Sequence, residues 1–101
     1  MKVWDELTDL EKRAAIARRL GWTHRAYTPH WPTNDGLAFT AVWPKLDSGL
    51  LIGKCHDVHG LHRTCGLWEF SHNGFELMYQ STTWADVICR AAYELLPSSR
   101  E

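Results

Sequence analysis

Two cysteines and three histidines lie within one stretch, from Cys55 to Cys65 (CHDVHGLHRTC). Cys55, His59, His62 and Cys65 offer two thiolates and two imidazoles, a ligand set that tetrahedral zinc accepts. Their spacing differs from the usual Cys-x-x-Cys and His-x₃-His pairs, so the alternative is a histidine-rich hairpin end whose cysteines pack as small apolar residues. We favour this alternative and expect no cofactor, with zinc kept as the competing interpretation.

The same stretch also holds the best candidates for catalytic residues, since Cys55 or Cys65 could act as a nucleophile with His59 or His62 as its base. Covalent catalysis needs a nucleophile, a base and an orienting group that converge in space. Cysteines and histidines this close along the chain meet whatever their function, and no glycine-rich loop resembles a phosphate-binding one. The sequence therefore favours a protein that is not an enzyme and has no catalytic residues.

A second group of interest is the loop from Tyr27 to Asn34 (YTPHWPTN), which holds two aromatic residues between prolines. Rigid aromatics on a loop stack on a nucleotide base or anchor a protein interface. We favour a third interpretation, in which Tyr27 and Trp31 fold back to cap the sheet. The candidate partner- or ligand-binding residues are Arg25, Tyr27, His30 and Trp31, together with His59 and His62.

Composition is that of an ordinary globular chain. Its 101 residues are 45% hydrophobic and 23% charged with a net charge of −1, which predicts one domain over residues 1–101 and argues against nucleic acid as a partner. No run approaches the about 18 apolar residues of a membrane span, and the N-terminus lacks a signal-peptide core. Three cysteines are too few for a disulfide framework. We expect a cytoplasmic protein without a membrane partner.

Helices are predicted at both ends of the chain. Thr8 and Glu11 have the spacing of a capping box, and Gly21 stands where a left-handed residue ends a helix. The last helix spans Thr83 to Leu96 and begins with Thr83 as its N-cap. Its apolar face is predicted to comprise Trp84, Val87, Ile88, Ala91, Ala92 and Leu95, with Cys89 as a core thiol.

Strands are predicted in the middle. Leu50 to His56 is a short apolar run that predicts a strand. The segments Thr64 to Ser71 and Phe75 to Gln80 flank a tight-turn signal at His72-Asn73-Gly74, which predicts a hairpin from Trp68 to Tyr79. Strand alternation predicts one shared face for Phe75, Leu77 and Tyr79.

The segment from Leu37 to Leu46 fits either a strand or a short helix. Pro44 removes a backbone donor, so a helix there should end or kink near Trp43. The order of elements predicts an α+β protein, with an antiparallel sheet of two to four strands covered by the N-terminal and C-terminal helices.

Thr83 to Tyr93 (TWADVICRAAY) resembles the C-terminal helix of the phage ABA sandwich domain family. Ala17 to Trp22 (ARRLGW) and Pro32 to Asp35 (PTND) resemble the end of that family's first helix and the start of its second. The chain departs from the pattern at Trp84, where a proline is frequent, and Cys55 to Cys65 has no counterpart. The resemblance implies a small phage or prophage protein with an α-β-α sandwich and no established catalytic residues.

Three functions follow. The first, which we favour, is a non-enzymatic phage or prophage accessory protein that binds a host protein in the host cytoplasm and inhibits a bacterial defence system. The second is a protein that sequesters a nucleotide or another small ligand, with Trp31, Tyr27 and His30 as a stacking wall and Arg25 near the phosphate. The third is a zinc-stabilised interaction module built on Cys55 to Cys65. A homodimer, through the strand edge at Leu50 to Lys54 or an exposed tryptophan, is compatible with each.

Overall fold

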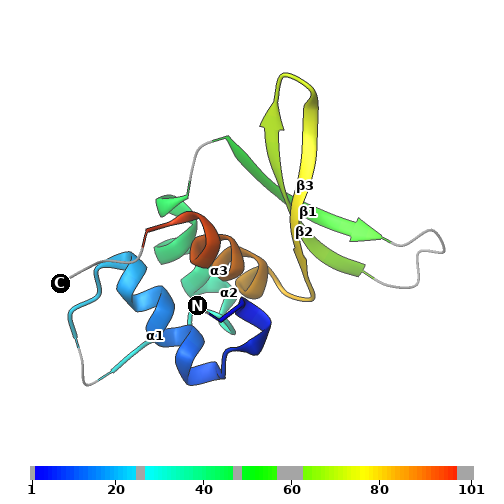
Figure 1. Cartoon of the computed structure of the whole chain (residues 1–101). Coiled ribbons are helices and arrows are strands. Elements are labelled where there is room, and N and C mark those ends of the chain that lie inside the picture. The colour runs from blue at the N-terminus through cyan, green and yellow to red at the C-terminus, as the bar shows by residue number, and fades with distance from the viewer. Residues whose placement is uncertain (1, 25–26, 47–48, 57–62, 98–101) are drawn as a thin grey trace.

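The computed structural model describes residues 2–24, 27–46, 49–56 and 63–97. Its elements are, in order, η1 (Trp4–Glu6), α1 (Asp9–Leu20), α2 (Asp35–Leu37), η2 (Ala38–Val42), η3 (Trp43–Lys45), β1 (Leu50–His56), β2 (Arg63–Ser71), β3 (Gly74–Ser81) and α3 (Trp84–Leu95). The three strands form one antiparallel sheet in the order β1-β2-β3, and the helices pack to one side of it (Figure 1). The predicted α+β class and antiparallel sheet are confirmed.

Helix α3 is the centre of the core, between the sheet and α1 (Figure 1). Val87, Ile88 and Ala91 are fully buried, as their helical spacing predicts, and Cys89 is buried with them. Leu95 was predicted on the same face but is 41% exposed, because the last turn of α3 borders an open pocket. The predicted role of the helix as the main packing element is confirmed, and within its last turn Ala92 and Tyr93 are still buried while Leu95 is not.

The predicted helix caps are present. Thr8 Oγ1 accepts a hydrogen bond of 3.1 Å from the Glu11 amide, and the Thr8 amide donates to Glu11 Oε1 at 2.8 Å. Gly21 ends α1 with a φ of 71°, in the left-handed region that favours glycine. Thr83 Oγ1 accepts from the Asp86 amide at 3.1 Å and begins α3. These local signals are readable from sequence because each bond spans only three residues.

The ambiguous segment from Leu37 to Leu46 is helical. Ala38 and Val42, four residues apart, are both fully buried, and η2 packs against α3. The Trp43 amide donates to the Ala38 carbonyl, one residue further back than in a regular α-helix, and the chain then tightens into η3. Pro44 lacks the amide that a regular turn would use, so the predicted break near Trp43 is confirmed.

The predicted hairpin is confirmed as β2 and β3, but a bulge changes one face of it. Leu67 pairs with Tyr79 and Trp68 pairs with Leu77, so β3 contains one extra residue at this point. Phe75 and Leu77 therefore lie on the face away from α3, whereas Tyr79 lies with buried Leu67 on the α3 side. The prediction that all three share a face was wrong, because strict alternation fails at a β-bulge.

Candidate interaction surfaces

The sheet face turned away from α3 is apolar. It carries Leu51 of β1, Trp68 and Phe70 of β2, and Phe75 and Leu77 of β3, and we call these five residues the outer face. Trp68 is half-buried and the other four are exposed. The rings of Phe70 and Phe75 meet across the hairpin with their centroids 5.1 Å apart. The outer face is thus one contiguous patch rather than a set of scattered residues.

The Trp68 ring occupies the space above Gly53. A Cβ atom added at Gly53 would stand 3.3 Å from Trp68 Cζ3. Beside this indole is a hollow lined by Leu51, Ile52, Trp68 and Phe75. The outer face therefore combines a depression with neighbouring side chains that project from it.

Charge is segregated between the two faces of the sheet. The strands' described residues place no charged side chain on the outer face, where Gln80 Nε2 donates a hydrogen bond of 2.6 Å to Thr64 Oγ1. The described charged side chains of the strands lie on the α3 side. Lys54 Nζ is 4.9 Å from the centroid of the Trp84 ring of α3, and Glu69 and Glu76 occupy opposite positions in the β2–β3 register. The outer face is therefore neutral as well as apolar.

Sequence reasoning missed the outer face, although β2 carried a signal for it. Cys65 and Leu67 point to α3 and are buried, while Trp68 and Phe70 occupy the opposite face. A strand with one solvated face alternates apolar and polar residues, whereas β2 has apolar residues on both faces. That pattern indicates a strand that is covered on both sides.

A second candidate surface is the aromatic loop, Trp22 to Asn34. The Trp22 indole Nε1 donates to the carbonyls of His24 at 3.0 Å and Tyr27 at 2.9 Å. Its ring meets Trp31 edge-on, with centroids 5.4 Å apart. Trp22 remains 41% exposed and Tyr27 54% exposed, and His30 is exposed as well. The loop thus displays the Trp22 indole, which internal hydrogen bonds hold in position, together with the exposed Tyr27 and His30 side chains.

Trp31 itself belongs to the core. It is 2% exposed and its Nε1 donates to the Arg13 carbonyl of α1 at 3.2 Å, while the Arg13 guanidinium donates to the Thr28 carbonyl. Trp31 is buried beside α1 and Tyr27 faces outward, so the favoured prediction that both cap the sheet was wrong. The loop is tied to α1 by hydrogen bonds to backbone carbonyls, which no side-chain pattern reveals. Arg25 lies outside the described residues.

The proposed zinc ligands are only partly described. Cys65 is 1% exposed, and it pairs with Lys54, while Cys55 pairs with Thr64 in the next rung of the ladder. His59 and His62 lie outside the described residues. Within the part that the structure does describe, no group of three or more His, Cys, Asp or Glu side chains is placed to hold a metal ion. A zinc site at Cys55 to Cys65 stays a prediction.

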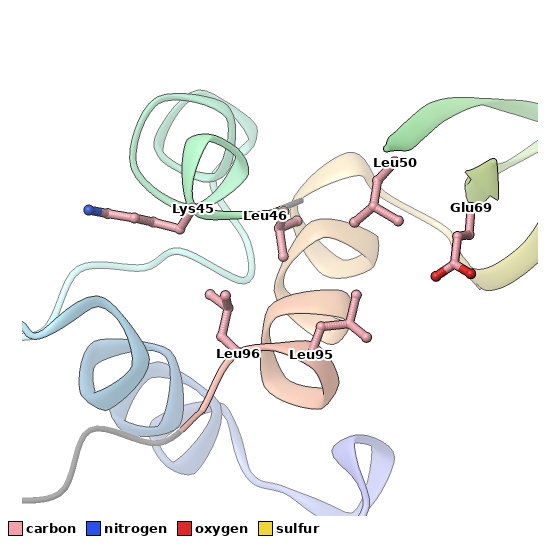
Figure 2. Close-up of a pocket in the computed structure, with 6 residues that line it drawn as sticks. All are labelled: Lys45, Leu46, Leu50, Glu69, Leu95 and Leu96. Carbon is pink, nitrogen blue, oxygen red and sulfur yellow. The ribbon is translucent and has the colours of Figure 1, made fainter. Parts of the chain in front are cut away.

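A pocket of about 390 Å³ lies where η3, the start of β1 and the end of α3 meet (Figure 2). Its lining residues are Leu46, Leu50, Leu95 and Leu96 together with Glu69 and Lys45, and Figure 2 shows the Lys45 side chain extending away from the leucines. Among these described residues, Glu69 is then the one polar side chain beside an otherwise apolar wall. Binding sites for small ligands usually combine an apolar wall with a few convergent polar groups. Because this wall lacks that convergence, we assign the pocket no ligand.

Comparisons of the chain with protein-family models, curated proteins and solved structures find no match. The relationship to the phage ABA sandwich family therefore stays a prediction based on the residues that carry it. In the described part of the chain, no helix is long and apolar enough to cross a membrane.

Proposed function

We propose that this protein acts by binding another protein through the aromatic loop. The observation that carries the proposal is the fixed position of Trp22, whose indole N–H is held by two carbonyls while its ring stays 41% exposed. A side chain that is already ordered loses little conformational entropy when it is covered. Exposed aromatics, here the pre-positioned Trp22 with the exposed Tyr27 near it, are typical anchors of protein interfaces.

The partner we propose is a component of a bacterial defence system, which the protein would inhibit in the host cytoplasm as a phage or prophage accessory protein. This part of the proposal is supported by the resemblance of Thr83 to Tyr93 to the phage family.

A non-enzymatic mode of action is supported by the state of the described thiols. Cys65 and Cys89 are both buried. Burial also raises the pKa of Cys89 far above its ordinary value of 9.0, so its nucleophilic thiolate form is disfavoured. Neither thiol is therefore an accessible nucleophile.

The alternative of nucleotide sequestration has less support. It relied on Trp31, Tyr27 and His30 as a stacking wall, and Trp31 is buried. A protein partner makes better use of what is exposed, since Trp22 and Tyr27 offer apolar area beside the polar His24 and His30.

The test is capture of partners from bacterial lysate with the tagged full chain. We expect a stoichiometric partner that mass spectrometry identifies as a defence component, and loss of that partner with the double variant Trp22→Ala/Tyr27→Ala. Both side chains are exposed, so the variant should fold normally. Leu10→Ala, which truncates a 67% exposed residue of α1, is the matched control and should retain the partner. Equal capture by the double variant and the wild type would refute binding through the aromatic loop.

A further inference from the structure

The sheet has two apolar faces and only one cover within the described chain. Helix α3 packs against β2 and β3 on one side, where Cys65 and Leu67 are buried. The outer face leaves Leu51 49%, Phe70 61%, Phe75 57% and Leu77 44% exposed. Patches of this kind on soluble proteins mark interaction sites.

We infer that the outer face is covered by a second copy of this chain. Two sheets would then pack face to face, roughly 10 Å apart, with one α3 on the outside of each. The resulting dimer has an α-β-β-α arrangement of layers. This inference uses a surface distinct from the aromatic loop and does not rest on the proposed function.

Charge favours a second copy over a foreign partner. In a two-fold dimer each patch meets itself, so any charge on the patch would face a like charge near the axis. The outer face carries no charge among the described residues of the strands, and the charged Lys54, Glu69 and Glu76 lie on the α3 side. Interfaces with foreign proteins commonly use complementary charge to select the partner, and this face offers none.

Shape is self-complementary as well. Phe70, the most exposed residue of the outer face at 61%, lies beside the hollow lined by Leu51, Ile52, Trp68 and Phe75. In a two-fold dimer the same patch of both copies forms the contact, so that patch must be complementary to itself. A projecting side chain beside a depression meets this requirement. In the proposed dimer, Phe70 of each copy enters the hollow of the other.

The area is sufficient for a specific interface. Four of the five residues are about half exposed and Trp68 is less exposed, so together they offer on the order of 500 Å² per copy. Two copies would bury roughly 1,000 Å² in total, which reaches the lower size range of specific protein interfaces. A dimer of this size should be reversible and concentration-dependent.

Analytical ultracentrifugation of the full chain over a hundredfold concentration range tests the inference. We expect the wild type to approach twice the chain mass at high concentration. Phe75→Lys places a like charge on both copies of the face and should weaken the dimer at least tenfold. Leu10→Lys makes the same kind of change at a 67% exposed site on α1 and should leave the dimer unchanged.

Circular dichroism and thermal melting show whether each variant folds. Leu77→Thr, a milder change that suits an exposed strand, is the second variant and should also weaken the dimer. The inference is overturned if the wild type stays monomeric throughout the range. It is equally overturned if a dimer forms with unchanged affinity in both folded variants, since that result would place the contact elsewhere, for example at the β1 edge.

Discussion

The indole nitrogen of Trp4 donates a hydrogen bond of 3.0 Å to the carboxylate of Asp86, joining residues 82 positions apart. Trp4 is 1% exposed, and its ring lies 5.5 Å from that of Tyr93. Asp86 stands in the first turn of α3. The N-terminal segment is thus bound to the central helix by an aromatic contact and a hydrogen bond, and it forms part of the core.

Truncation of Trp4 should therefore be among the most destabilising single changes. We expect Trp4→Ala to lower the free energy of unfolding by about 3–5 kcal/mol, because it leaves a cavity and removes the indole N–H that donates to Asp86. Trp4→Phe keeps most of the apolar contact and should cost less. Urea denaturation measures both. Val3→Ala, at a 56% exposed neighbour, is the control and should stay within about 0.5 kcal/mol of the wild type.

Removal of the N-cap of α3 should lower the free energy of unfolding by less than truncation of Trp4 does. Thr83→Ala deletes the hydroxyl that accepts from the Asp86 amide and should cost about 1 kcal/mol. Thr82→Ala makes the same chemical change at the preceding exposed residue and serves as the control. Chemical denaturation of both variants gives the comparison. Equal losses would show that the hydroxyl of Thr83 does not act as a cap.

Stability should depend on pH through Asp5. The Arg90 guanidinium donates a hydrogen bond to this carboxylate and holds its pKa below the ordinary value of 3.8. A carboxylate whose pKa is lowered by folding stabilises the protein above its unfolded pKa, and that contribution is lost as the pH falls through the folded value. The free energy of unfolding attributable to Asp5 should therefore decline below about pH 4.

The free energy of unfolding of the Asp5→Asn variant should decline less steeply over the same acid range. Denaturation curves measured from pH 7 to pH 3 give the comparison. The difference should be small, at most about 1 kcal/mol, since the Asp5 side chain is 71% exposed and solvent screens the pair. Arg90→Gln removes the other partner and should reduce the same acid dependence. If the two variants lose stability as steeply as the wild type, the pair makes no contribution.

Gly53 and Trp68 should be energetically coupled. Gly53→Ala places a Cβ 3.3 Å from the Trp68 ring, so the indole must shift by a few tenths of an ångström. We expect Gly53→Ala to destabilise the wild type but to be neutral or stabilising in a Trp68→Ala background. A double-mutant cycle by denaturation should give a coupling of about 1 kcal/mol. A coupling near zero would mean that the indole does not rest over Gly53.

Which parts were predictable depended on the distance that each signal spans. The caps at Thr8 and Thr83 and the break at Pro44 are set by atoms within one or two helical turns, so sequence spacing was enough to place them. The apolar face of α3 was also readable, because its period reflects burial along the whole helix. The predicted burial of Leu95 was wrong, because burial at the end of a helix depends on which neighbouring segments cover it.

The candidate surfaces were harder to predict. Tyr27 and Trp31 stand in one short loop, yet Trp31 is packed in the core with its Nε1 donating to the Arg13 carbonyl, whereas Tyr27 is exposed. Contacts with α1 make this difference, and residue spacing within the loop does not encode them. The outer face depends on strand register, and no side-chain pattern announced the bulge that separates Tyr79 from Leu77.

The sequence by itself determined the α+β class, both terminal helices, the hairpin and the helix caps, because these follow from local hydrogen bonding and from periodicity. Only the tertiary structure decided that Leu37 to Leu46 is helical, that Trp31 is core, and that Phe70 and Phe75 share an uncovered face. These outcomes depend on which surfaces meet. The burial of Ala38 and Val42 against α3 joins segments far apart in the chain, where residue spacing carries no information. The pairing of Trp68 with Leu77 depends on a bulge within the hairpin, which strict strand alternation does not indicate.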